Sequence, residues 1–385
     1  MFQALFNSLS GLFSFSRSLD TVSNNVSNMN TPGFRGSDTF FENVNGGLGT
    51  RISGDGLRTS SGDIRQTGTP TDLAIDGNGF FVLRDGNGNL YYTRAGQFRF
   101  NEDGLLVDSV TGYQVMAIDS AGNLQSIDLD GYRTLPPQAT TSVRMVGNIA
   151  PGTPSTTINS IRVYDSAGAL HTLTATLTDN TAVTPGSYLV SVVDETGATI
   201  GTGEVRFGTD GTPLAGFNTL VLNPTYQGVA QSITLNFGTP GAFSGATRLA
   251  GIASNLGAQV ADGHPLLGIT DLSFDDKGVL QVVYSSSEKR SGPQIALASF
   301  PNESALDMVG GRLIAGTSVL QRELGRPGEG VFGRIAGGSL ELSNVDLTQE
   351  FADMIIIQRG YQASSRVMTV SNEMIEQLYN STRGG

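Results

Sequence analysis

The sequence predicts a mainly β protein with an α-helix at each end of the chain, in which one antiparallel β domain is inserted into another. Three observations support this fold class. Both ends are poor in glycine and proline and place apolar residues three and four positions apart, as an amphipathic helix does. Between them, short alternating runs are separated by Asp-Gly and Asn-Gly pairs, which are typical of hairpins. The 385 residues also include 51 glycines, as expected for a turn-rich β protein.

The first predicted element is an α-helix over residues 1–30. One set of apolar residues recurs every seventh position, and Leu9 comes from a partner set that is only partly apolar. These predicted interface residues are Leu5, Leu9, Leu12, Leu19 and Val26. The segment Thr31-Pro32-Gly33 ends the helix, because proline cannot donate the next helical hydrogen bond.

The last predicted element is a second helix over residues 347–385, which we expect to pair in a coiled coil because its apolar repeat lasts more than four heptads. Asp346 is a suitable N-cap for this helix. The predicted interface residues are Leu347, Phe351, Met354, Tyr361, Met368 and Ile375. Either repeat alone is equally consistent with a helix that packs on its own domain. Two such repeats at opposite ends, each with polar residues at many core positions, favour pairing with each other or with neighbouring chains.

Between the helices, composition divides the chain further. Residues 31–69 and 325–346 are polar and rich in glycine, so the sequence predicts a linker beside each helix. Residues 70–141 and 266–324 predict an inner β domain, and residues 142–265 predict an inserted outer β domain. The pattern Asp-x-x-Gly-x-Leu begins at Asp119, Asp165 and Asp275, and its irregular spacing predicts separate hairpin turns rather than a solenoid.

Composition excludes several classes of protein. The net charge of −12 argues against a nucleic-acid-binding surface, which would be basic. No apolar run is long enough for a membrane span, so we expect no membrane insertion. The chain has no cysteine, which excludes disulfides and thiol catalysis. Residues 1–15 lack the basic start of a secretory signal, so an exported chain would use another route.

The sequence shows no catalytic site, and we expect neither enzymatic activity nor a cofactor. The two histidines, His171 and His264, have no triad partners nearby in sequence. Oxygen-bearing residues alternate from Asp76 to Asn78 and from Asp85 to Asn89, as in a calcium loop, but the chelating glutamate and flanking helices of an EF-hand are missing. A hairpin is the favoured interpretation, and we expect no metal site.

Three motifs in order resemble those of the bacterial flagellar rod and hook proteins. The first runs from Asn24 to Phe34, the second from Asp72 to Phe81, and the third combines 343–347 with 357–362. Ser27 departs from the alanine that many members carry there. The terminal positions that match the family are Asn24, Asn25, Asn28, Thr31, Gly33, Phe34, Asn344, Asp346, Gln358 and Tyr361. The roughly 130 additional β residues before the C-terminal helix resemble the hook members more than the shorter rod members.

The resemblance implies a structural subunit of a curved helical tube, the universal joint between the flagellar rod and filament. It implies a homopolymer held together by the terminal helices and located outside the cell. Implied partners are the rod and hook–filament junction proteins, the flagellar type III export apparatus and the hook cap. Two alternatives remain open: a distal rod or hook-associated axial protein, or a secreted β-rich adhesin or carbohydrate-binding module.

Overall fold

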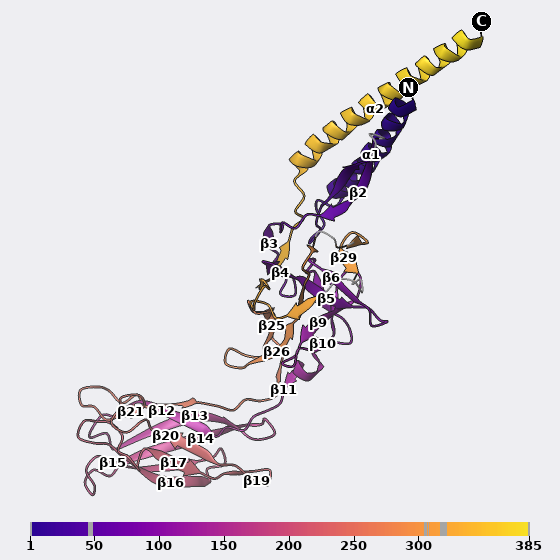
Figure 1. Cartoon of the computed structure of the whole chain (residues 1–385). Helices are drawn as coiled ribbons and strands as arrows, with labels where there is room; N and C mark the ends of the chain where they lie inside the picture. Colours follow the sequence, from indigo (N-terminus) through magenta and orange to yellow (C-terminus); the bar gives the residue numbers. More distant parts are fainter. Residues whose placement is uncertain (1, 45–48, 304–305, 307, 316–321, 384–385) are drawn as a thin grey trace. The chain divides into compact units, whose positions relative to one another are not determined.

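The computed structural model describes residues 2–44, 49–303, 306, 308–315 and 322–383. It confirms the predicted fold class: helices α1 (Phe2–Ser27) and α2 (Leu347–Arg383) lie at the two ends, and all the described strands lie between them (Figure 1). The chain forms two compact units, of which the first combines Met1–Tyr132 with Ile269–Gly385. The second unit, Arg133–Gly268, is inserted into the first.

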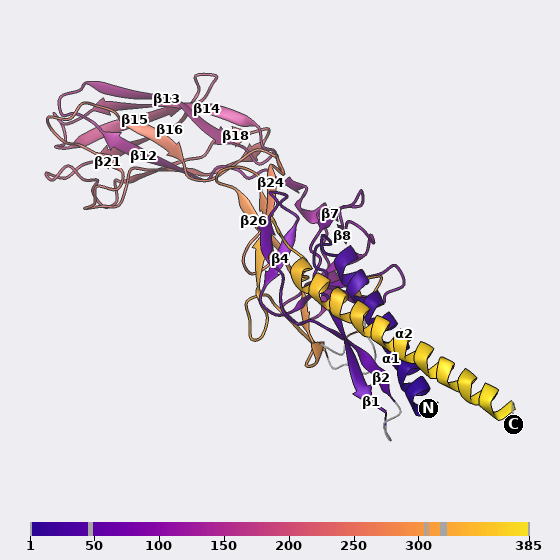
Figure 2. The ribbon, with the colours of Figure 1, turned by 90° about the horizontal axis from the view of Figure 1, so that it is seen from above.

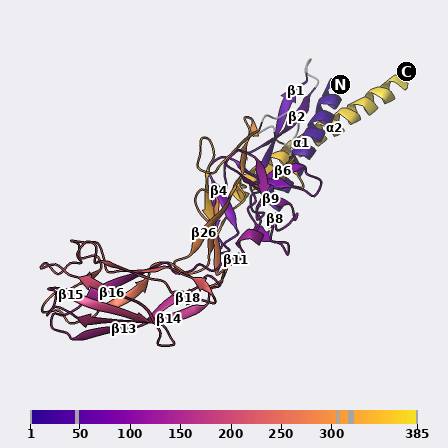
Figure 3. The same ribbon diagram turned by 90° about the horizontal axis from the view of Figure 1, so that it is seen from below.

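In the first unit, α1 and α2 lie side by side, and a β hairpin packs beside α1 (Figures 2 and 3). The hairpin strands β1 (Ser37–Asn43) and β2 (Thr50–Leu57) are antiparallel. Side chains join the hairpin to α1: the Thr21 and Thr39 hydroxyls lie 2.8 Å apart, and Arg17 forms an ion pair with Asp55 at 3.1 Å. The hairpin therefore belongs to the helical end of the unit.

The remaining strands of this unit come from both sides of the insertion. In the main sheet, β24, β25, β26, β9, β5, β6, β29 and β28 follow one another. Because β26 pairs with β9 and β29 pairs with β6, the two chain segments form one sheet. The bounds are β3 (Ile64–Gln66), β4 (Leu73–Asp76), β5 (Phe80–Arg84), β6 (Leu90–Thr93), β7 (Phe98–Phe100), β8 (Leu106–Asp108), β9 (Gln114–Ile118), β10 (Leu124–Ser126), β24 (Asp271–Phe274), β25 (Val279–Val283), β26 (Lys289–Ile295), β27 (Leu297–Ser299), β28 (Met308–Val309), β29 (Leu313–Ala315), β30 (Glu323–Gly325), β31 (Arg334–Gly337) and β32 (Ser339–Glu341). A short 3-10 helix spans Asp130–Tyr132.

Aromatic side chains fill part of the core of this unit. The Phe300 ring packs edge-on against Phe80 and Tyr92, with centroids 5.9 and 4.9 Å apart. Ile314 and Met116 belong to the same buried cluster. Since these residues come from both segments, burial of apolar surface holds the two halves of the unit together.

The second unit consists of two main sheets over one core. One sheet has the order β13-β14-β15-β16, and in the other β17, β20, β12 and β21 follow one another, with β22 beside β12. β12 pairs in parallel with β20 and β21, which departs from a purely antiparallel domain. The bounds are β11 (Thr134–Leu135), β12 (Ser142–Asn148), β13 (Ser155–Tyr164), β14 (Leu170–Asp179), β15 (Ser187–Val193), β16 (Thr199–Arg206), β17 (Thr219–Leu222), β18 (Thr225–Tyr226), β19 (Val229–Ala230), β20 (Ile233–Asn236), β21 (Ala246–Thr247), β22 (Gly257–Val260) and β23 (Leu267–Gly268).

The Asp-x-x-Gly repeats form hairpin turns, as predicted. In the turn before β14, the Asp165 carboxylate accepts hydrogen bonds from the amides of Ala167 and Ala169, at 2.9 and 2.8 Å. Gly168 has a φ of +84°, which glycine adopts without strain. The turns that begin at Asp119 and Asp275 make the same pair of amide bonds.

The predicted linkers and domain boundary differ from the structure. The range 31–69 holds β1, β2 and β3, and 325–346 holds β31 and β32. The β1–β2 hairpin escaped prediction because its strands are largely exposed and lack apolar alternation. The second unit begins at Arg133 rather than at 142 and ends at Gly268 rather than at 265, because two-residue strands, β11 and β23, pair there.

Candidate functional site: the terminal helices and their junction

Helices α1 and α2 meet along a seam of close backbone approach. A Cβ atom at Gly11 would lie 3.0 Å from the Oγ of Ser364 on α2. A Cβ at Gly360 would lie 2.5 Å from the Phe15 ring on α1. A larger residue at Gly360 would require the Phe15 ring to move, and one at Gly11 would crowd the Ser364 hydroxyl.

The fully buried side chains of α1 are mostly small and polar: Ser8, Ser14, Ser18, Val22 and Asn25. The hydroxyls of Ser8 and Ser14 have partners within reach. Ser8 donates to the Leu5 carbonyl at 2.8 Å, and the Ser14 and Thr50 hydroxyl oxygens lie 3.4 Å apart. The sequence prediction missed these buried serines because it considered only apolar repeats. The recurrence of small residues along α1 could have indicated them.

The predicted interface residues do not form one buried seam. Phe351 and Tyr361 are 48% and 46% exposed, and Phe13, which the prediction omitted, is 69% exposed. Two paired helices therefore leave much apolar surface uncovered. The remaining predicted residues are half-buried: Leu5, Leu9, Leu12, Leu19, Val26, Leu347, Met354, Met368 and Ile375.

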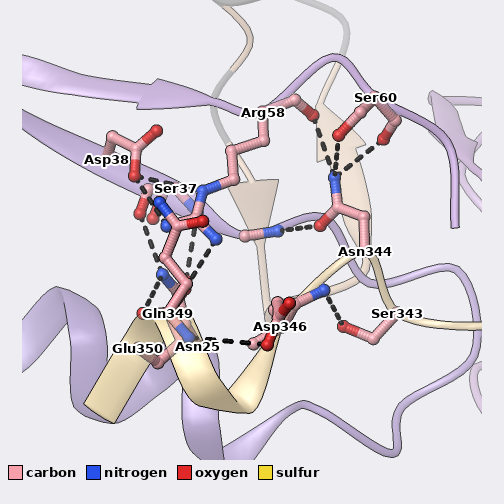
Figure 4. Close-up of polar contacts among 12 residues, drawn as sticks. Asn25, Ser37, Asp38, Arg58, Ser60, Ser343, Asn344, Asp346, Gln349 and Glu350 are labelled. Atoms are coloured by element: carbon pink, nitrogen blue, oxygen red, sulfur yellow. Dashed lines mark hydrogen bonds and ion pairs between the residues drawn. The ribbon is translucent and has the colours of Figure 1, made fainter. Parts of the chain in front are cut away.

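A buried polar junction joins the two helices to the hairpin (Figure 4). The Asn25 side-chain amide donates to the Ser37 carbonyl at 3.0 Å and to the Glu350 carboxylate at 3.2 Å, and its oxygen accepts from the Ser37 amide. Arg58 donates to the other Glu350 oxygen at 2.6 Å and also to Asp38. The Glu350 side chain is 0% exposed, so its charge depends on these donors.

The Arg58 guanidinium is held by both carboxylates. Its hydrogen bond to Asp38 has the largest effect and raises its pKa above the ordinary value, against the opposing effect of partial burial. Sequence reasoning missed Arg58 and Glu350, because neither lies within the motif positions. Their partners come together only when the hairpin folds onto the helices.

Two further motif residues hold the start of α2. The Asn344 side chain accepts from the Gly36 amide at 2.8 Å and donates to the Ser60 carbonyl at 2.8 Å (Figure 4). Asp346 accepts from the Thr348 amide at 2.7 Å, which is the N-cap bond predicted for this helix. Asn344 thus ties the entry of α2 to the segment that follows α1.

Gly33 and Phe34 connect α1 to the inner β domain. Gly33 has a φ of +69°, and a Cβ there would lie 2.3 Å from the Ala95 backbone nitrogen. Its amide donates to the Glu341 carbonyl at 2.8 Å, and Phe34 is 2% exposed. The position therefore requires glycine on grounds of both conformation and space.

Beneath this connection lies a buried ion pair that sequence reasoning also missed. Arg94 lies 3.1 Å from Glu341, and each side chain is 1% exposed. Arg94 also donates to the carbonyls of Gly77 and Gly79 at 2.7 and 2.8 Å. Burial lowers the pKa of Arg94 to about 10 and raises the pKa of Glu341. The fold holds both charges at a cost in desolvation, and the pair fixes the chain before β5 against β32.

The other motif residues form local turns or face outward. Asn28 donates to the Asn24 carbonyl at 2.9 Å, and Thr31 donates to Asn28 at 3.2 Å, which closes the end of α1. Gln358 is exposed on α2, with no role in the junction.

The residues considered for catalysis or metal binding serve local structure. Asp85 accepts from the Asn87 and Asn89 amides at 2.9 and 2.8 Å, as a hairpin turn requires. His171 lies between Asp165 and Glu195, at 3.3 and 3.1 Å. Within the described residues, no cluster of three or more His, Asp or Glu side chains could hold a metal ion.

Family models match three parts of the chain, at both ends and in the inner β domain. A model of the flagella basal body rod protein matches residues 5–35, and one of the flagellar hook protein FlgE/F/G D1 domain matches 74–150. A model of the flagellar basal body rod FlgEFG protein C-terminal region matches 336–381. The buried polar junction thus lies where the two terminal matches meet in space.

Relatives match over nearly the whole length. The flagellar hook protein FlgE of Salmonella typhimurium is 30% identical, and the alignment covers 97% of this chain and 98% of that protein. The chain belongs to the flagellar hook protein family. The FlgE of Borreliella burgdorferi is 28% identical over 98% of this chain and 99% of that protein. The crystal structure of Helicobacter pylori FlgE2 shares the fold, with a TM-score of 0.51, 15% identity and coverage of 72% of this chain and 100% of that chain.

Family membership makes the chain a structural component of the bacterial flagellum and does not favour an adhesin. Among the helices of the described residues, none is long and apolar enough to cross a membrane.

Proposed function

We propose that this chain polymerises into the flagellar hook through its terminal helices, and that the resulting curved tube is the universal joint between rod and filament. The observation that carries this proposal is the uncovered apolar surface of the helices. Phe6 and Phe13 on α1 are 57% and 69% exposed, and Ile356 and Val367 on α2 are 65% and 48% exposed. Large apolar side chains exposed on paired helices are typical of an interaction site when they gather on one face, as Phe6 and Phe13 do around one hollow.

The predicted interface residues fit this arrangement. Within one copy the seam is filled by serines and glycines, so the outward side chains, including Phe351 and Tyr361, remain for neighbouring copies. A contact between two different surfaces of identical subunits does not close on itself and builds a helical filament. The terminal helices would then form the inner layer of the tube and the β domains its outer layers.

The proposed setting is outside the cell. We expect export through the flagellar type III apparatus, the route that the flagellar resemblance implies. The expected partners are the hook cap during assembly, the rod at one end of the tube and the junction proteins at the other. We expect no nucleic acid, no cofactor and no enzymatic activity.

A distal rod or hook-associated protein is not favoured, because the relatives that match over nearly the whole chain are hook proteins. Both would use terminal helices of this kind, and the inserted second unit of Arg133–Gly268 favours the hook. Electron microscopy of polymerised protein distinguishes them, since curved tubes support a hook and straight tubes support a rod.

Deletion and substitution test the role of the helices. Chains lacking 1–30 or 347–385 should fail to form tubes but keep their β circular dichroism. Deletion also removes the buried polar junction. The substitutions Phe13→Ser and Ile356→Ser change exposed side chains and leave that junction intact, and both should weaken polymerisation of a folded monomer. Val183→Ser in the second unit, where Val183 is 80% exposed, is the matched control. Normal tubes from the truncated chains would refute the proposal.

A further inference from the structure

The seam between α1 and α2 has a single antiparallel register. Gly11 faces Ser364, Phe15 faces Gly360, and Asn25 bonds to Glu350. In each pair the two residue numbers total 375, so residue n of α1 lies opposite residue 375 − n of α2. The register can therefore be extended along both helices.

This register leaves the end of α2 without an opposite helix. Position 373 faces Phe2, the first residue of α1, and α2 continues to Arg383. Ser371 is the last buried side chain of α2, and Met374 and Leu378 are 49% and 54% exposed. All three ribbon views show the C-terminal end of α2 extending past the N-terminal end of α1 (Figures 1, 2 and 3). We call residues 374–383 the overhang.

The outward face of α1 carries an apolar patch of similar length. Phe6, Leu9 and Phe13, with Ser10, line a hollow of about 370 Å³. Residues 1–16 include no charged side chain. Phe6, Leu9 and Phe13 follow the three- and four-residue steps of one helix face. We call these three residues the α1 patch.

We propose that the overhang of one copy docks on the α1 patch of a second copy. This inference rests on the proposed polymerisation and names its contact. Met374 and Leu378 are four residues apart, as are Leu9 and Phe13, so two apolar rows of equal length can pack together. In an antiparallel contact, this spacing places Met374 beside Phe13 and Leu378 beside Leu9. The residue numbers total 387 in both pairs, so one register satisfies both contacts.

The geometry prevents the same contact within one copy. In the intrachain register Phe13 lies opposite position 362, which is 12 residues before Met374. At a rise of 1.5 Å per residue these two side chains are about 18 Å apart along the axis. The second copy must therefore be displaced by about 18 Å along the helices, and because the overhang and the patch are different surfaces, the contact repeats without closing.

Engineered disulfides test this contact directly, because the chain has no cysteine of its own. Tubes of the full-length double variant Phe13→Cys/Met374→Cys are assembled under reducing conditions and then oxidised. The expected result is a ladder of covalent dimers and higher oligomers on non-reducing gels. Leu9→Cys/Leu378→Cys, in the same register, should give the same ladder and provides a second test if the first variant assembles poorly.

Two control pairs of cysteines distinguish the proposed contact between copies from a bond within one chain and from non-specific crosslinking. Gly11→Cys/Ser364→Cys should close within one chain, since a Cβ at residue 11 would lie 3.7 Å from the Ser364 Cβ, a normal disulfide spacing. Asn7→Cys/Met374→Cys should give no ladder, because at 3.6 residues per turn the Asn7 side chain points about 100° away from Phe6 around α1 and lies outside the α1 patch.

Failure of this inference differs from failure of the proposed function. If tubes are seen by electron microscopy and the control pair closes, yet neither register pair gives a ladder, the contact is wrong and polymerisation stands. An equal ladder from the Asn7 pair would also overturn the register. If the unmodified protein forms no tubes at all, the proposed function itself fails.

Discussion

Removal of Arg58 should release the helices from the hairpin. Glu350 is 0% exposed and lies 2.6 Å from Arg58, whose side chain is 18% exposed. Breaking a buried pair by removing one partner costs about 3–5 kcal/mol, because the other charge stays buried. The Asn25 amide still donates to Glu350 in the variant Arg58→Met, so we expect about 3 kcal/mol, the lower end of that range.

The assay is hydrogen exchange of the backbone amides of Gly36 and Ser37, which donate to the side chains of Asn344 and Asn25. Since 1.4 kcal/mol is a tenfold change, about 3 kcal/mol should accelerate their exchange by about 100-fold. Amides of the second unit should not change and serve as an internal control.

Two further variants decide whether the charge is responsible. Asp38 is the other partner of Arg58, and its side chain is 51% exposed. Asp38→Asn should therefore lower the free energy of unfolding by only about 0–1 kcal/mol. Arg58→Met/Glu350→Gln leaves no unpaired buried charge and should recover most of the lost protection. If Arg58→Met accelerates exchange no more than Asp38→Asn does, the buried charge of Glu350 does not hold the helices to the hairpin.

Three other predictions follow from local contacts. Gly33→Ala should lower the melting temperature of the first unit by several degrees, because its Cβ would lie 2.3 Å from the backbone of Ala95, whereas Gly86→Ala, with nothing within 4 Å, should not. A hydrogen bond from the Asn89 side chain lowers the pKa of Asp85, and one from the Asn123 backbone amide lowers the pKa of Asp119. The stability that these two turns contribute is therefore present above the ordinary aspartate pKa. It is lost as the pH falls through the pKa of the folded state. The protection factors of the Asn89 and Asn123 amides, relative to an unfolded chain at the same pH, should fall below about pH 4. Protection factors that stay constant down to about pH 2 would contradict this prediction. Burial opposes the charge on His171, but hydrogen bonds to Glu195 and Asp165 outweigh this effect and raise the pKa of the ring. The stability that the charged ring contributes is therefore full below about pH 6.5. It is lost as the pH rises through the pKa of the folded state. An NMR titration of the His171 ring in the native chain and in Glu195→Gln should give a lower pKa in the variant, and an equal pKa would contradict this assignment.

The elements that the sequence identified were those with strong local signals. The helix over 347–385 was readable because its apolar spacing continues over many turns and Asp346 caps it. The hairpin turn at Asp165 was readable because an aspartate and a glycine three residues later satisfy the turn on their own. The β1–β2 hairpin was not predicted, because its largely exposed strands lack apolar alternation.

The candidate site shows the same division. Asn25 and Asn344 were found through a motif, but the motif did not reveal what they bind. Arg58 and Glu350 were missed because they lie 292 positions apart in sequence. The apolar residues of α1 were identified correctly as apolar rows, yet the seam itself is made of Ser8, Gly11 and other small residues.

The sequence by itself determined the fold class, the helical ends, the hairpin turns and the flagellar resemblance, because each depends on neighbours within a few positions or on a short motif. Only the tertiary structure decided which face of each helix is covered within one copy and which charges are buried. The physical reason is that close packing and desolvation depend on distant segments meeting. Gly11 and Ser364 set the register of α1 against α2, and that register leaves the end of α2 for a neighbour.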